Sequence, residues 1–142
     1  MNVGKFILNI VVAFIAYGVL YSAGDAMFAD AFASAMAMMN PPEATMVPVL
    51  GYHLVQTVVV VWLFGKAVGS GDMKAGGMFG FMIGLYLVAT DNNWFTIIKD
   101  FPQDARLPLD VMHLVIGVLV GMLLAFMWGR GWGFGADEGA EA

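Results

Sequence analysis

Two histidines and a group of aspartates are the side chains with which this sequence could do chemistry. Imidazoles beside carboxylates can bind a divalent metal ion or pass protons near neutral pH, and histidine can ligate haem or another tetrapyrrole. Equally, such groups can form a hydrogen-bond network that only holds helices together. The candidate polar cluster comprises Asp91, His53, His113, Asp110, Asp25 and Asn92, with Tyr21 nearby. For a metal ion the candidate ligands are His53, His113 and Asp91, but the sequence assigns no metal and no cofactor.

Four apolar runs must position this cluster. The chain is 61% hydrophobic and only 12% charged, which is the composition of an integral membrane protein. Each run approaches the roughly 20 residues that cross a hydrocarbon core of about 30 Å. The sequence therefore predicts a single all-α membrane domain over residues 1–142, a four-transmembrane-helix antiparallel bundle. Its predicted spans are residues 6–21, 47–68, 76–98 and 111–128, followed by an acidic tail at 136–142. Alternating spans place the candidate cluster in one leaflet.

Glycines at intervals of four residues mark two of the predicted spans. In the third span these are Gly76, Gly80 and Gly84, and in the fourth they are Gly117 and Gly121. Residues four apart share a helix face, and small residues let two transmembrane helices approach closely. Asp91 follows Gly84 by about two turns, and His113 precedes Gly117 by four residues. The sequence predicts that the two glycine faces pack together and that Asp91 pairs with His113 or His53.

Several local patterns carry further expectations. Residues 24–40 have large apolar residues at spacings of four, four and three, which predicts an interfacial amphipathic helix after a bend near Gly24. On the second span His53 and Gln56 share a face that we expect to point inward. Asp110 stands where an N-cap would start the fourth span. Residues 129–135 are rich in glycine, which predicts an interfacial tail without a helix.

Composition excludes several classes of function. The chain has no cysteine, so disulfides, thiolate metal sites and cysteine nucleophiles are excluded. A net charge of -5 argues against nucleic acid as a partner. We find no phosphate-binding glycine loop and no nucleophile with an obvious base. We therefore expect a protein without enzymatic activity, an accessory or structural subunit of a larger membrane complex or a homo-oligomer. The alternatives are a small transporter or ion- or proton-coupled protein using the cluster, and haem, pigment or metal binding through the two histidines.

The basic residues predict an orientation. The two termini and the second loop carry four of them, the third loop carries two, and the first loop carries none. Since cytoplasmic loops are enriched in Lys and Arg, both termini are expected in the cytoplasm, and the membrane is expected to be the bacterial inner membrane. The four residues are Lys5, Lys66, Lys74 and Arg130, and the two are Lys99 and Arg106.

The order of polar residues also resembles a family. Asp25 closes the first span, the glycine-rich third span runs into a polar segment, a proline-containing connection follows, and Asp110 opens the fourth span. The matching residues are Asp25, Gly80, Tyr86, Thr90, Asp91, Asn92, Asn93, Lys99, Pro102, Asp110 and Gly117. This arrangement resembles an uncharacterised bacterial family of predicted four-span membrane proteins, known only as a domain of unknown function. The chain departs from the family pattern Tyr-x-x-Thr-x-Asp-x-Thr-Asn by compressing its end to Asp-Asn-Asn, and by having His113. The resemblance implies the four-span fold and the importance of Asp91 and Asp110, and it implies no substrate.

Overall fold

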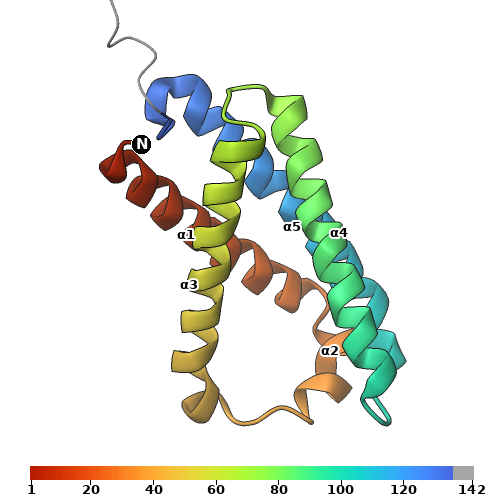
Figure 1. Ribbon diagram of the computed structural model, residues 1–142. Coiled ribbons are helices and arrows are strands. Elements are labelled where there is room, and N and C mark those ends of the chain that lie inside the picture. The colour runs from red at the N-terminus through yellow and green to blue at the C-terminus, as the bar shows by residue number, and fades with distance from the viewer. Residues whose placement is uncertain (136–142) are drawn as a thin grey trace, which may run out of the picture.

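The computed structural model describes residues 1–135, and all regular elements of this range are helical (Figure 1). Four helical segments are long and apolar enough to cross a membrane, namely α1, α3, α4 and the run from Gln103 to Trp132 that contains α5. The chain is thus an all-helical, multi-pass membrane protein. The predicted acidic tail at 136–142 lies outside the described residues. In order, the elements are α1 (Val3–Met27), α2 (Ala29–Met36), α3 (Pro42–Ala67), α4 (Met73–Ile97), the 3-10 turn η1 (Gln103–Ala105), α5 (Arg106–Met127) and the π-helical turn η2 (Trp128–Trp132).

Each long helix begins before the apolar run that predicted it, and in α1 and α4 a capping residue marks the start. Asn2 caps α1 by accepting a hydrogen bond from the Lys5 backbone N–H, and Asp72 caps α4 in the same way. The expectation that Asp110 caps the fourth span is wrong. α5 begins at Arg106, one turn earlier, and Asp110 lies inside the helix.

α4 and α5 form the closest helix pair, along what we call the glycine seam. The two helices run antiparallel, and their backbones meet at three places. A Cβ atom added at Gly80 would lie against the backbone carbonyl group of Gly117, and one added at Gly121 would lie against that of Gly76. Only glycine permits this approach, since a backbone cannot rotate out of the way as a side chain can. The facing pairs are Gly76 with Gly121, Gly80 with Gly117, and Gly84 with His113.

The buried core runs along α5 from Met112 to Met127 and reaches the end of the molecule where the chain starts and α5 finishes (Figure 1). Phe64 of α3 is fully buried there against the rings of Phe79 and Trp128. The ring of Phe134 packs edge-on against Phe6 and Trp128. We call this the closed end of the bundle. Its buried residues include Asn9, Ala13, Val61, Phe64, Leu124, Met127 and Phe134.

The glycine-rich segment after α5 starts with a helical turn and brings Phe134 back to the core, so the prediction that it lacks a helix is wrong. Trp128–Trp132 forms one π-helical turn, and Gly131 takes a left-handed φ of 80° that turns the chain back. The returning segment is tied to α1: the Asn2 backbone N–H donates to the Phe134 carbonyl oxygen at 3.0 Å, and the Asn9 side-chain amide donates to the Trp132 carbonyl oxygen at 2.8 Å. Burial of aromatic rings outweighs the low helix propensity of glycine.

α3 is packed along only its second half. All of its buried residues, Thr57, Val61 and Phe64, lie there, whereas every residue from 46 to 56 is exposed. We call residues 46–56 the exposed half of α3. The face of α3 that carries His53 is directed toward α1, since the His53 ring centroid lies 6.5 Å from that of Tyr21, but neither His53 nor Gln56 is covered. α4 uses its glycine face on α5, so it does not cover the first half of α3.

α2 is shorter than the helix predicted for residues 24–40. α1 continues through Gly24 to Met27, and the chain bends at Phe28, whose φ of -109° and ψ of 24° are not helical. α2 then packs against η1, with Ala35 buried. The predicted bend near Gly24 thus occurs at Phe28, because the hydrogen bond from the Phe28 N–H to the Gly24 carbonyl oxygen prolongs the first helix.

Candidate functional site

A chain of two hydrogen bonds joins three of the long helices at His113 of α5. The His113 Nε2 atom lies 2.8 Å from the Asp91 Oδ2 atom of α4, and the His113 Nδ1 atom lies 2.5 Å from the Tyr21 hydroxyl of α1. The imidazole is buried, while the Asp91 side chain keeps 32% of its surface exposed. We call Tyr21, His113 and Asp91 the polar triad.

The chemistry of the three groups determines which atom donates and which accepts in each hydrogen bond. An ionised Asp91 carboxylate can only accept hydrogen bonds, so His113 must donate to it from Nε2. In a neutral imidazole the Nδ1 atom is then an acceptor, and the Tyr21 hydroxyl donates to it. If His113 takes up a proton, Nδ1 also becomes a donor and the Tyr21 oxygen becomes the acceptor. The triad can therefore hold either protonation state of His113 by rotating one hydroxyl hydrogen.

Two glycines bring the triad together. Gly84 lets the backbone of α4 contact the backbone of His113, and Asp91 follows Gly84 by about two helical turns. On the other side, a Cβ atom at Gly24 would collide with the Met112 side chain. α1 and α5 are therefore close at this level, and Tyr21, one turn before Gly24, reaches the ring of His113. The glycine seam and Gly24 position the functional side chains.

A second polar contact joins α4 to the start of α5. The Asn92 side-chain amide donates to the Asp110 Oδ1 atom at 2.7 Å and to the Val88 carbonyl oxygen at 3.0 Å. Nearby, the Arg106 guanidinium donates to the Phe95 carbonyl oxygen at 2.6 Å. Asp110 therefore acts as an acceptor between helices. These contacts hold the connection between α4 and α5 in place beside the triad.

The remaining candidates do not join the triad. Asp25 is exposed at the end of α1, and His53 is exposed on α3, where its ring centroid lies 6.5 Å from that of Tyr21. Within residues 1–135, no three His, Cys, Asp or Glu side chains are grouped closely enough to hold a metal ion. The structure thus does not assemble the three candidate metal ligands His53, His113 and Asp91 around one point.

Sequence reasoning placed Tyr21 near the cluster but gave it no role. The available signal was its position three residues before Gly24, on a face that also carries Asn9, Ala13 and Tyr17 at helical spacing. That face packs into the bundle: Asn9 and Ala13 are fully buried, and Tyr17 packs against the core. A tyrosine on such a face needs a hydrogen-bond partner for its hydroxyl, and His113 supplies it.

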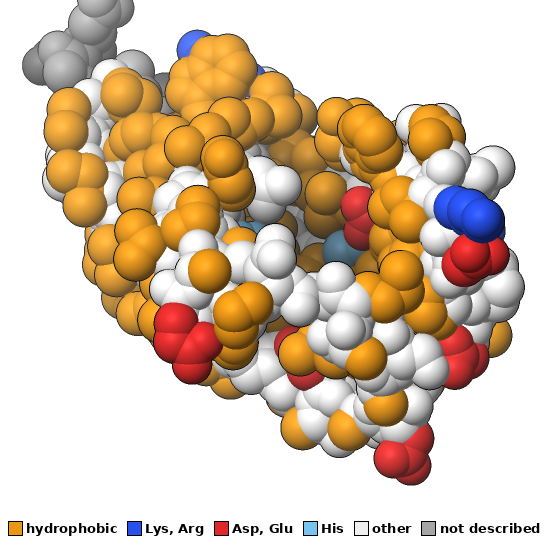
Figure 2. Space-filling model, turned by 90° about the horizontal axis from the view of Figure 1, so that it is seen from below, with side chains coloured by type: hydrophobic (Ala, Val, Ile, Leu, Met, Phe, Trp, Pro, Cys, Tyr) orange, Lys and Arg blue, Asp and Glu red, His pale blue; other side chains and the backbone are white. Residues whose placement is uncertain are grey.

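The triad is open toward one end of the molecule. Figure 2 shows the end where α2 and the connection between α4 and α5 lie, and its centre is hollowed, with histidine and acidic side chains inside. The opposite end is the closed end, where Phe64 and Trp128 pack together. The arrangement can fasten three helices, and it can exchange a proton with the hollow.

Comparisons of the chain with protein-family models, curated proteins and solved structures found no match. The resemblance to the four-span family therefore stays a prediction.

Proposed function

We propose that this protein is a small multi-pass membrane protein without enzymatic activity, which works as an accessory or structural subunit of a larger membrane complex or as a homo-oligomer. The observation that supports this is the exposed half of α3. On an otherwise apolar helix it carries His53 and Gln56, whose side-chain polar atoms have no hydrogen-bond partner within residues 1–135. A helix of another subunit or of a second copy would supply those partners.

The proposal includes a specific placement in the membrane. We propose a four-span antiparallel bundle in the bacterial cytoplasmic membrane, with both termini in the cytoplasm and α2 at the opposite interface. The distribution of basic residues supports this orientation, since Lys66, Lys74 and Arg130 accompany the closed end. Lys66 lies 5.9 Å from the centroid of the Trp62 ring, an arrangement suited to an interfacial anchor.

Cysteine cross-linking in native membranes tests the association. The natural chain has no cysteine, so a single introduced thiol reports one position. Val55→Cys lies on the exposed half of α3 with 62% of its surface exposed, and Val19→Cys on α1 is a matched control at 63%. With a heterobifunctional reagent that carries one thiol-reactive and one amine-reactive group, we expect Val55→Cys to give a discrete cross-linked adduct. Its mass identifies either a second copy or another subunit.

The control decides the interpretation. Val19→Cys should give no adduct of the same mass, because nothing in the proposal places a partner on that face of α1. Equal cross-linking at Val55 and Val19 would mean random collisions in the membrane. No adduct at Val55, combined with full labelling by a lipid-soluble maleimide, would mean that lipid alone covers α3, and it would overturn the proposal.

A second candidate, a proton-coupled membrane protein, is favoured by the polar triad beneath the hollow. His113 has a donor or acceptor on each ring nitrogen, so a proton arriving from the hollow can be taken up without breaking the chain. At the closed end the rings of Phe64 and Trp128 pack together. Transport across the bilayer would therefore require Phe64 and Trp128 to separate. The proton-coupled candidate thus requires a second conformation of the protein, whereas the accessory-subunit proposal does not.

Proton flux into liposomes tests this candidate. After an acid pulse, proteoliposomes should acidify faster than empty liposomes, and Asp91→Asn should reduce the excess rate at least tenfold because an amide cannot take part in proton transfer. Asp104→Asn removes an exposed carboxylate near the same end and should keep the rate. Equal rates for native protein and empty liposomes would reduce the triad to a structural contact.

A further inference from the structure

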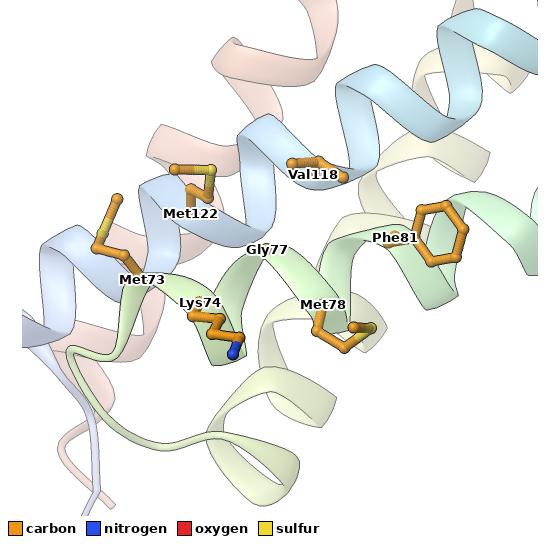
Figure 3. Close-up of a pocket in the computed structure, with 7 residues that line it drawn as sticks. All are labelled: Met73, Lys74, Gly77, Met78, Phe81, Val118 and Met122. Carbon is orange, nitrogen blue, oxygen red and sulfur yellow. The ribbon is translucent and has the colours of Figure 1, made fainter.

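A groove follows the outer face of the α4–α5 pair, away from the polar triad. It has a volume of about 460 Å³ and is open along its length. Figure 3 shows its lining, which is apolar apart from one lysine at its end. The lining residues are Met73, Lys74, Gly77, Met78, Phe81, Val118 and Met122.

A second groove continues the first. It has a volume of about 300 Å³ and shares Phe81 and Val118 with the first. From there it runs on along α5 toward Leu114. Between Met122 and Leu114 the helix advances about 12 Å at 1.5 Å per residue. The two parts together form one narrow apolar furrow parallel to the helices, which we call the outer groove.

The glycine seam explains why the outer groove exists. Close packing of the two backbones leaves large side chains standing on either side of the contact, with Met78 and Phe81 on α4 and Met122 and Val118 on α5. Gly77 adds no side chain between them, and a Cβ atom there would lie 3.4 Å from the Met122 Cγ atom. The groove is therefore deepest at Gly77, where there is no side chain to fill it.

Lys74 stands at the end of the outer groove with an unused charge. Within residues 1–135 its ammonium group forms no ion pair, hydrogen bond or contact with an aromatic ring. The neighbouring cations differ: Lys66 lies over the Trp62 ring and Arg130 over the Phe126 ring. An apolar furrow with one free cation at the membrane surface complements a molecule with a long hydrocarbon chain and an anionic head.

We propose that the outer groove binds one acyl chain of an anionic phospholipid, whose phosphate pairs with Lys74. The chain fills the furrow over Gly77 and continues past Phe81, where the flexible methionines Met78 and Met122 adapt to it. This site is independent of the proposed association through α3 and of the triad, because it lies on the α4–α5 face and shares no residue with either.

Lipid retention measured by native mass spectrometry tests the site. We would titrate the full chain in detergent with phosphatidylglycerol and, separately, with phosphatidylcholine. Lys74→Gln should weaken the first phosphatidylglycerol about fivefold, the effect of one interfacial lysine, and leave phosphatidylcholine unchanged. Lys66→Gln removes the same charge at the same end but outside the groove, and it should have little effect.

A second substitution tests the apolar part of the site. Gly77→Leu should place its side chain in the groove and displace both lipids, whereas Gly18→Leu on α1, where nothing lies within 4 Å of a Cβ atom, should displace neither. Circular dichroism checks that both variants fold, and if Gly77→Leu does not fold, Lys74→Gln alone decides. Equal losses in Lys74→Gln and Lys66→Gln would show general charge attraction. Unchanged retention in a folded Gly77→Leu would mean non-specific lipid contact, and either result would overturn the proposal.

Discussion

Gly80→Ala is expected to lower the free energy of unfolding by about 3 kcal/mol, the upper end of the usual cost of overpacking. The added methyl group would lie against the carbonyl oxygen and carbon of Gly117. Both atoms belong to the backbone of α5, so no rotamer change can relieve the contact. The two helices would have to move apart, and the contacts at Gly76 and Gly84 would loosen with them.

A matched alanine substitution separates this steric effect from helix propensity. Gly51→Ala on α3 adds the same methyl group where nothing lies within 4 Å. Alanine favours a helix over glycine by about 1 kcal/mol, so Gly51→Ala should be neutral or stabilising. Thermal unfolding of both variants in the same detergent, followed by circular dichroism, measures the difference. Equal stability of the two variants would mean that α4 and α5 are farther apart at the glycine seam than the structure shows.

The helices and the seam could be predicted because their signals are local and repeated. Apolar runs of about 20 residues have few alternatives to a membrane span, and four helices of that length and composition are confirmed. The interval of four between Gly80 and Gly84 puts both on one face whatever the rest of the fold does. The same periodicity carried Asp91 to the level of His113, which the structure places 2.8 Å apart.

The extent to which α3 is buried could not be predicted, because it depends on which neighbours the helix meets. His53, Gln56 and Thr57 share a helix face, yet only Thr57 is buried. Periodicity identifies the polar face of a helix but says nothing about how far a neighbour extends along it. The prediction for residues 129–135 missed the burial of Phe134 because no local pattern indicates it. Phe134 is separated from the helix by glycines, and only the contacts with Phe6 and Trp128 explain its burial.

His113→Ala is expected to have the second large effect, a loss of about 2 to 3 kcal/mol of unfolding free energy. Removing the imidazole leaves Asp91 without its donor and Tyr21 without its partner, and each unsatisfied buried group costs about 1–3 kcal/mol. Because 32% of the Asp91 side chain is exposed, water recovers part of the loss at the carboxylate. His53→Ala is the matched control and should cost little in detergent-solubilised monomer, since His53 is exposed.

A double-mutant cycle then shows whether the triad acts as one unit. Tyr21→Phe should cost about 1 kcal/mol alone, the typical net value of one hydrogen bond. In the His113→Ala background it should cost almost nothing, because the hydroxyl has already lost its acceptor. Additive losses would mean that the two side chains stabilise the bundle separately and that the 2.5 Å contact contributes nothing. Strong coupling would mean that the His113 ring, which pairs with Asp91, also holds α1 against α5. Protonation of His113 would then change contacts among all three helices.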